Sequence, residues 1–235
     1  MASRLHNFVR TLTWNDFPGN PTPDELEELR KIAAANRTMT VGMAGIHCDF
    51  SVDFGGSSKA TLTAVPGRSP GVFALADTIT VTATMDTVKS WRRTAPLSAA
   101  EEALLLSHEQ GHFDLMALMA RDCFIALMQL KTSTFSDQPS GQTAADTIVS
   151  DFQKKLRAMQ KHYDKETRHG AWVTVSHGAR MLGPRKEREQ NQWEGFIDTA
   201  QTEERKPAMA SPVDGMTYKR TILEVLDQKG SIVFK

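Results

Sequence analysis

The chain has 235 residues, 40% hydrophobic and 24% charged, which is typical of one globular domain with a core of its own. Lys and Arg number 28, as do Asp and Glu, so the net charge is zero and nothing in it favours binding to nucleic acid. No run of 18 apolar residues occurs, so we expect no membrane span.

The N-terminus, MASRLHNFVR, lacks the apolar stretch of a secretory signal peptide. A cytoplasmic location, a leader missing from this sequence and export by a route without such a peptide all stay open. The sequence predicts no oligomeric state. Cys48 and Cys123 lie far apart and form no metal or redox motif, so we expect two buried thiols.

The first predicted element is a helix over residues 22–36. Thr22 suits the N-cap, and Glu25 stands three residues on, as in a capping box. Short β-branched and apolar stretches then predict strands, with a turn at Gly55-Gly56. These strands are expected at residues 38–53, 59–65 and 77–84.

The strand over residues 77–84, DTITVTAT, alternates strictly between apolar and threonine side chains. Such alternation predicts a half-buried strand in a sheet with one solvated face. A strand of this kind at a sheet edge can pair with an extended peptide substrate. The alternative is an internal strand, and the sequence does not decide between them.

Two long helices follow. Ser98 and Glu101 form a capping box at the start of the first, whose helical periodicity continues to about Lys131. The second follows a loop over residues 132–143 and ends near Gly170, a typical C-terminal signal.

The C-terminal part has weaker patterns. Residues 183–206 are polar and charged, which predicts a solvated helix or loop. Residues 218–235 read as a β-hairpin with strands over 221–226 and 231–234.

Residues 108–112, His-Glu-Gln-Gly-His, form an HExxH motif inside the first long helix. Residues four apart lie on one face of a helix, so His108 and His112 can bind one zinc ion. Glu109 is turned about 100° away from His108 and can act as general base on a metal-activated water. Gly111, in mid-helix, indicates that another group approaches the helix closely there.

A catalytic zinc needs one further protein ligand, whereas a structural zinc needs four closed ligands. The candidates lie at the end of the second long helix: His162, Asp164, Glu166 and His169. Glu166 continues the apolar face of that helix, so its carboxylate is expected to point inward. His169 stands where the chain can turn toward the metal, and Asp164 is expected to be exposed or to bond the helix end.

Several segments beyond the five-residue motif carry a family resemblance: Trp14-Asn15-Asp16-Phe17, Ser90-Trp91, His108 to Asp114 (HEQGHFD), Tyr163 to Gly170 (YDKETRHG) and Gln192-Trp193. With them the chain resembles, over about residues 10–198, the bacterial domain-of-unknown-function 922 family, described as predicted secreted zinc-dependent proteases. The resemblance implies an α+β, zincin-like fold. In it, a small, twisted, mainly antiparallel sheet packs on two long helices, the first carrying HExxH. We expect this domain over residues 1–198 and a C-terminal tail over 199–235.

The resemblance further implies a zinc metallopeptidase acting on a protein or peptide substrate. His108 and His112 are then zinc ligands and Glu109 is the catalytic base. His169 is the expected third ligand, with Glu166 as the next candidate.

The roles of Asp114 and Tyr163 stay open at this point. Asp114 either orients an imidazole or is an exposed helix acid. Tyr163 either bonds a developing oxyanion or is a core tyrosine. The remaining histidines are expected to be structural or on the surface: His6, His47 and His177.

Two other functions fit the same residues. The metal site could cut peptidoglycan cross-links or another amide, for instance in an exported antibacterial toxin. The chain could also be a non-catalytic binding module that the metal stabilises, in which case Glu109 is dispensable.

Overall fold

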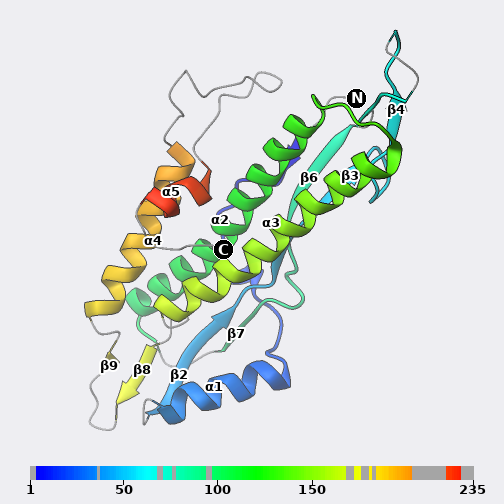
Figure 1. Ribbon diagram of the computed structural model, residues 1–235. Helices are drawn as coiled ribbons and strands as arrows, with labels where there is room; N and C mark the ends of the chain where they lie inside the picture. Colours follow the sequence, from blue (N-terminus) through cyan, green and yellow to red (C-terminus); the bar gives the residue numbers. More distant parts are fainter. Residues whose placement is uncertain are drawn as a thin grey trace.

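The computed structural model describes residues 4–35, 38–67, 71–75, 78–93, 97–167, 172–175, 180–181, 184–202 and 221–228. Its two longest elements are helices α2 (Ala99–Leu130) and α3 (Gln138–Thr167), which lie side by side (Figure 1). Small sheets pack against them. The fold is therefore α+β with two long helices, as expected.

The sheet next to α2 has three strands in the order β1-β6-β3: β1 (Arg4–His6), β6 (Ile79–Met85) and β3 (Cys48–Phe54). Strand β6 is paired on both sides, parallel to β1 and antiparallel to β3. The predicted alternation is confirmed, because Ile79, Val81 and Ala83 are buried in the core. The possibility that β6 is a sheet edge was wrong, because the N-terminal strand covers that side.

The expectation of one sheet also needs correction. The stretch predicted as a single strand over residues 38–53 breaks at Ile46 and His47 into β2 (Thr38–Gly45) and β3, which join different sheets. The second sheet has the order β7-β2-β8-β9, and β4 pairs with β5. These strands are β7 (Trp91–Arg93), β8 (Trp172–Val175), β9 (Arg180–Met181), β4 (Leu62–Ala64) and β5 (Phe73–Leu75).

Both predicted capping boxes are present. Helix α1 (Pro23–Ala35) packs beside β2, and at its start Thr22 Oγ1 accepts from the Glu25 backbone N–H. At the start of α2, Ser98 and Glu101 bond each other's backbone N–H groups. Helix α2 is buried around most of its circumference, because it packs between a sheet and further helices. No helix in the described ranges has the length and apolarity to span a membrane.

The C-terminal part folds onto the body of the protein. The helix expected as one alternative in this segment is present as α4 (Pro184–Thr202), but it buries Trp193, Phe196 and Ile197, so the expectation that it is solvated was wrong for that face. The expected hairpin was wrong as well, because its first strand is helix α5 (Ile222–Gln228). Thr221 and Glu224 form a capping box there, which the prediction of a hairpin did not take into account. The second expected strand, over 231–234, lies outside the described residues.

Two neighbouring side chains of helix α2 bind the backbone of helices α4 and α5. Arg121 Nη1 donates to the carbonyl of Ala200, and Asp122 Oδ2 accepts from the backbone N–H of Ile222. The boundary expected at residue 198 falls inside α4, and α5 packs on α4 and α2. The division into a domain and a tail stays a prediction.

Candidate metal centre

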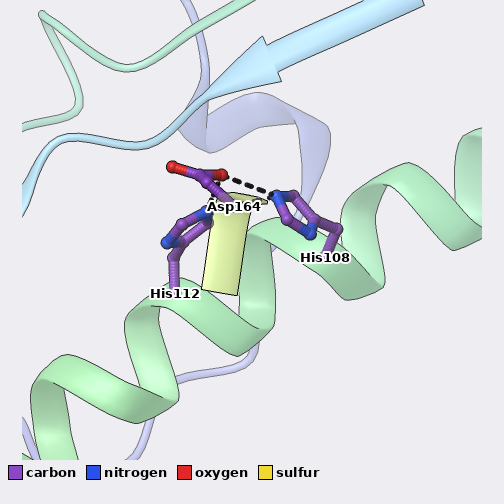
Figure 2. A group of neighbouring side chains, drawn as sticks. All are labelled: His108, His112 and Asp164. Carbon is purple, nitrogen blue, oxygen red and sulfur yellow. Dashed lines mark hydrogen bonds and ion pairs between the residues drawn. The ribbon is translucent and has the colours of Figure 1, made fainter. Parts of the chain in front are cut away.

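Three side chains from the two long helices converge on one point (Figure 2). His108 and His112 project from α2, and Asp164 reaches them from α3. The two Nε2 atoms are 3.1 Å apart, and Asp164 Oδ1 lies 2.9 Å from His112 Nε2 and 3.4 Å from His108 Nε2. Both imidazoles are buried, whereas 26% of the Asp164 side chain is exposed.

This triangle has the size of one face of a metal coordination shell. In a tetrahedron with metal–ligand distances of about 2.0–2.2 Å, neighbouring ligand atoms lie about 3.3–3.6 Å apart. The separation of 3.4 Å falls within this range, and those of 3.1 and 2.9 Å are slightly shorter. Two nitrogens and one carboxylate oxygen are also the donor types that zinc takes in catalytic sites. The three residues are therefore a group that could hold a metal ion.

The far side of each imidazole ring has its own amide partner. Gln160 Oε1 lies next to His112 Nδ1, and Gln190 Oε1 lies 3.4 Å from His108 Nδ1, with Thr167 Oγ1 at 3.3 Å. An amide oxygen only accepts, so each Nδ1 carries the proton that it donates. When both rings are neutral, as metal binding requires, each Nε2 then presents a lone pair to the centre of the triangle. A cation there relieves the repulsion among the converging acceptors.

The pKa values of the two histidines shift in opposite directions from that of a free imidazole. Burial lowers the pKa of His108 to about 4, so this ring is neutral at pH 7. Burial also disfavours the charged form of His112, but the carboxylates of Asp164 and Glu109 outweigh it and raise the pKa of His112 to about 9. Without a metal ion, a proton on His112 is the positive charge that holds Asp164 in place.

Glu109 lies beside the triangle and not within it. It is buried, and its Oε2 accepts a hydrogen bond of 3.0 Å from the backbone N–H of Ile46, between β2 and β3. Glu109, His108, His112 and Asp164 all line one cavity of about 690 Å³. Its walls also come from α1, the residues between β2 and β3, and α3. The general base expected from the motif therefore faces the same space as the three residues that could hold a metal ion.

Tyr163 packs directly against the motif. Its ring stacks on that of His108 with centroids 4.7 Å apart, and its hydroxyl donates to the carbonyl of His108 and bonds Gln190. A Cβ atom at residue 111 would overlap this hydroxyl, which explains the glycine in mid-helix. Because Tyr163 is fully buried, the interpretation as a core tyrosine holds.

The four candidates for the third ligand do not lie together. Asp164 joins the two histidines, so the expectation that it is exposed or bonds the helix end was wrong. Glu166 accepts from Trp193 Nε1 and pairs with His162 at 3.0 Å, apart from the metal group. His169 lies outside the described residues, and its part as a ligand stays a prediction.

Two other residues have a different place from the one expected. Asp114 accepts from Gln110, which also binds the backbone of Arg10 and Leu12, so it orients the N-terminal segment and no imidazole. His47 lines the cavity beside the metal group, where the sequence indicated only a structural or surface residue.

The glutamines that hold the imidazoles were missed by sequence reasoning. Gln160 lies one turn before Asp164 on α3, a spacing of four that puts both on one helix face. That spacing was readable once Asp164 was chosen. Gln190 comes from α4, and no local pattern connects it to a motif 82 residues earlier.

The two cysteines are free thiols. Cys123 is buried in the core as predicted, and Cys48 is partly exposed at the cavity wall, where burial raises the pKa of its thiol.

One comparison with known proteins found a match. A family model described as "Bacterial protein of unknown function (DUF922)" matches residues 22–170. The resemblance seen in the sequence motifs is confirmed over this span, which holds the metal group and Glu109 but not α4. No curated protein and no solved structure matches the chain.

Proposed function

Since the chain belongs to the DUF922 family, we propose from the geometry of its site that it is a zinc-dependent metallopeptidase. In this proposal His108, His112 and Asp164 hold the zinc ion and Glu109 is the general base. The observation that carries it is the triangle of ligand atoms with Glu109 beside it on the wall of one cavity.

Each protein group has a defined task. A bound zinc ion supplies Lewis acidity, which polarises a carbonyl and lowers the pKa of a water molecule. Glu109 takes the proton from the attacking water and passes it to the leaving amine. The Ile46 N–H fixes one oxygen of that carboxylate at 3.0 Å, and burial of Glu109 keeps bulk water from competing for the proton.

The cavity supports a peptide as the substrate. Its volume of about 690 Å³ lies within the range of small-molecule and peptide sites. Apolar side chains such as Leu29 and Leu156 line it together with polar groups, which suits the mixed surface of a polypeptide. The reaction needs no covalent intermediate, because the nucleophile is water.

Metal analysis and a peptide library test the proposal. We expect one zinc ion per chain and, with the zinc-loaded protein, new peptide termini detected by mass spectrometry. Glu109→Gln should keep the zinc ion and lose hydrolysis by a factor of about 10² to 10⁴. Glu102→Gln, on α2 but outside the cavity wall, is the matched control and should remain active.

Two results would overturn the proposal. One is a zinc-loaded wild-type chain that cleaves no peptide in the library. The other is Glu109→Gln with the activity of the wild type, which would favour a binding module. Hydrolysis of peptidoglycan fragments with no cleavage of linear peptides would move the substrate to the amidase class.

A further inference from the structure

We infer that His47, held by Glu25, is a second catalytic residue of the cleft and donates a hydrogen bond to the substrate oxygen on which negative charge develops. This inference rests on the proposed function and adds a residue that the HExxH mechanism does not use. Its basis is a network that joins α1, the residues between β2 and β3, and the start of β7.

The carboxylate of Glu25 is the centre of this network. Its Oε1 lies 3.0 Å from His47 Nε2 and accepts from Trp91 Nε1 at 2.8 Å. Its Oε2 accepts from Thr22 N and Oγ1 at 2.6 and 2.7 Å. Burial alone would raise the pKa of Glu25, but these hydrogen bonds hold it below its ordinary value. Glu25 is therefore an anion that fixes the imidazole.

The backbone of His47 is held on both sides. Its N–H donates to Ser90 Oγ at 3.0 Å, and its carbonyl accepts from Asp86 N at 2.8 Å. Ser90 Oγ in turn donates to the Asp86 carbonyl. Ser90-Trp91 thus holds both members of the pair, because the serine binds His47 and the tryptophan binds Glu25. This segment is one of those that carry the family resemblance, and the HExxH mechanism assigns it no role.

The pair lies at the reaction site. His47 and Glu25 line the same cavity as Glu109 and the two metal-binding histidines. The preceding residue, Ile46, gives its N–H to Glu109. Because Nε2 is engaged by Glu25, Nδ1 is the nitrogen left for a substrate, and it has no hydrogen-bond partner within the described part of the chain.

A carboxylate that binds one imidazole nitrogen orients the ring. In the inferred role both ring nitrogens of His47 carry a proton, so that Nε2 donates to Glu25 and Nδ1 donates to the substrate. A preorganised donor in the same cavity as the base stabilises the oxygen of the carbonyl under attack, and His47 makes no covalent bond to the substrate. Removal of one such donor typically lowers kcat by about 10² to 10³.

The chain contains a matched control. His162 Nε2 lies 3.0 Å from a Glu166 oxygen, as His47 Nε2 does from Glu25, although only the His47 contact has hydrogen-bond geometry. The exposed fractions of the two histidine side chains are 33% and 36%. His162 is not on the cavity wall. Its replacement therefore reports the effect of losing such a pair at a place without substrate.

The experiment compares His47→Ala, His47→Gln and His162→Ala with the wild type, all zinc-loaded. We expect equal zinc content, a kcat for His47→Ala that is about 10² to 10³ lower, and partial recovery in His47→Gln, whose amide can donate. His162→Ala should stay within threefold of the wild type. Calorimetry with a peptide phosphonate, whose charged oxygens resemble the developing anion, should give weaker binding to His47→Ala alone.

Failure of the inference differs from failure of the proposed function. If the wild type hydrolyses peptides in a Glu109-dependent way but His47→Ala keeps kcat and phosphonate affinity within threefold, His47 has no catalytic part. Loss of zinc or of the folded circular dichroism spectrum in both His47 variants would make the pair structural and overturn the inference. A wild type that hydrolyses nothing overturns both.

Discussion

The Tyr163 hydroxyl occupies the space into which a Cβ atom of Gly111 would project. This contact sets how close α3 comes to α2 at the motif, and the same tyrosine ring stacks on His108. The approach of the two helices thereby brings Asp164, one residue after Tyr163, within reach of both imidazoles. A glycine between the histidines is therefore part of how the metal group is assembled.

Gly111→Ala should destabilise the protein although alanine favours helices. The new methyl group must displace the buried Tyr163, and overpacking of this kind costs about 1–3 kcal/mol. Gly195→Ala, at an exposed position of α4 with no atom within 4 Å of the new Cβ, should stabilise by up to about 1 kcal/mol. Urea denaturation followed by circular dichroism measures both, and equal effects of the two variants would contradict the contact.

Asp164→Asn should weaken zinc binding by more than about 100-fold, more than the loss of an outer partner costs. The amide removes the charged oxygen that lies 2.9 and 3.4 Å from the two imidazoles. Competition with a fluorescent zinc chelator measures the affinity. Asp114→Asn, a carboxylate that binds Gln110 and no imidazole, is the control and should bind zinc as the wild type does.

The same titration with His169→Ala decides between the two candidates for the third ligand. If Asp164 is the ligand, the affinity of His169→Ala stays within about threefold of the wild type. A loss confined to His169→Ala would instead support the ligand expected from the family motif.

Gln190→Leu should lower zinc affinity by about 10 to 100-fold, because it removes the amide oxygen that faces His108 Nδ1. Gln192→Leu, two residues along on the exposed side of α4, provides the comparison. Chelator competition again gives the numbers. Equal affinities for the two variants would mean that α4 plays no part in orienting the imidazole.

Zinc binding should release about one proton near neutral pH. The carboxylates raise the pKa of His112 to about 9, so its proton must leave when the metal binds, whereas His108 is already neutral. Zinc affinity should then rise about tenfold per pH unit between pH 7 and pH 8. Calorimetry in buffers of different ionisation enthalpy counts the protons, and a count of zero would refute the assignment.

The raised pKa of His112 also determines how the stability of the metal-free fold depends on pH. Because the pKa of His112 is higher in the folded than in the unfolded chain, its contribution to stability is complete below pH 6.5 and disappears as the pH rises through about 9. Thermal unfolding of the metal-free protein should therefore shift to lower temperature between pH 7 and pH 9. In Asp164→Asn this shift should be smaller.

The features that could be predicted from the sequence are local ones. The capping boxes at Thr22 and Ser98 each involve residues three apart, and the two motif histidines are four apart on one helix. Interactions of such short range depend little on the rest of the fold. The strand at residues 77–84 was recognisable for the same reason, because alternation is a property of the segment itself.

Predictions that depended on packing failed. Asp164 was expected to be exposed because the apolar face of α3 was taken as its only buried face, whereas α2 also covers the side that carries Asp164. Strand β6 is not a sheet edge, because a strand from the N-terminus, about 75 residues away, pairs with it. The hairpin was predicted from β-branched residues at 221–226, and the Thr221 capping box together with burial against α2 and α4 favours a helix instead.

The sequence by itself determined where the first long helix begins, that two histidines and a glutamate share it, and that a close neighbour had to exist at Gly111. The start of the second was placed too late, because the loop expected over residues 132–143 ends before Gln138. Only the tertiary structure decided which carboxylate lies against the two histidines, that Gln160 and Gln190 bond the imidazoles, and that His47 shares their cavity. The physical reason is the reach of the interactions. Helix periodicity acts over a few residues, whereas the rotation of α3 and α4 against α2 is set by side-chain packing between segments 50 to 80 residues apart.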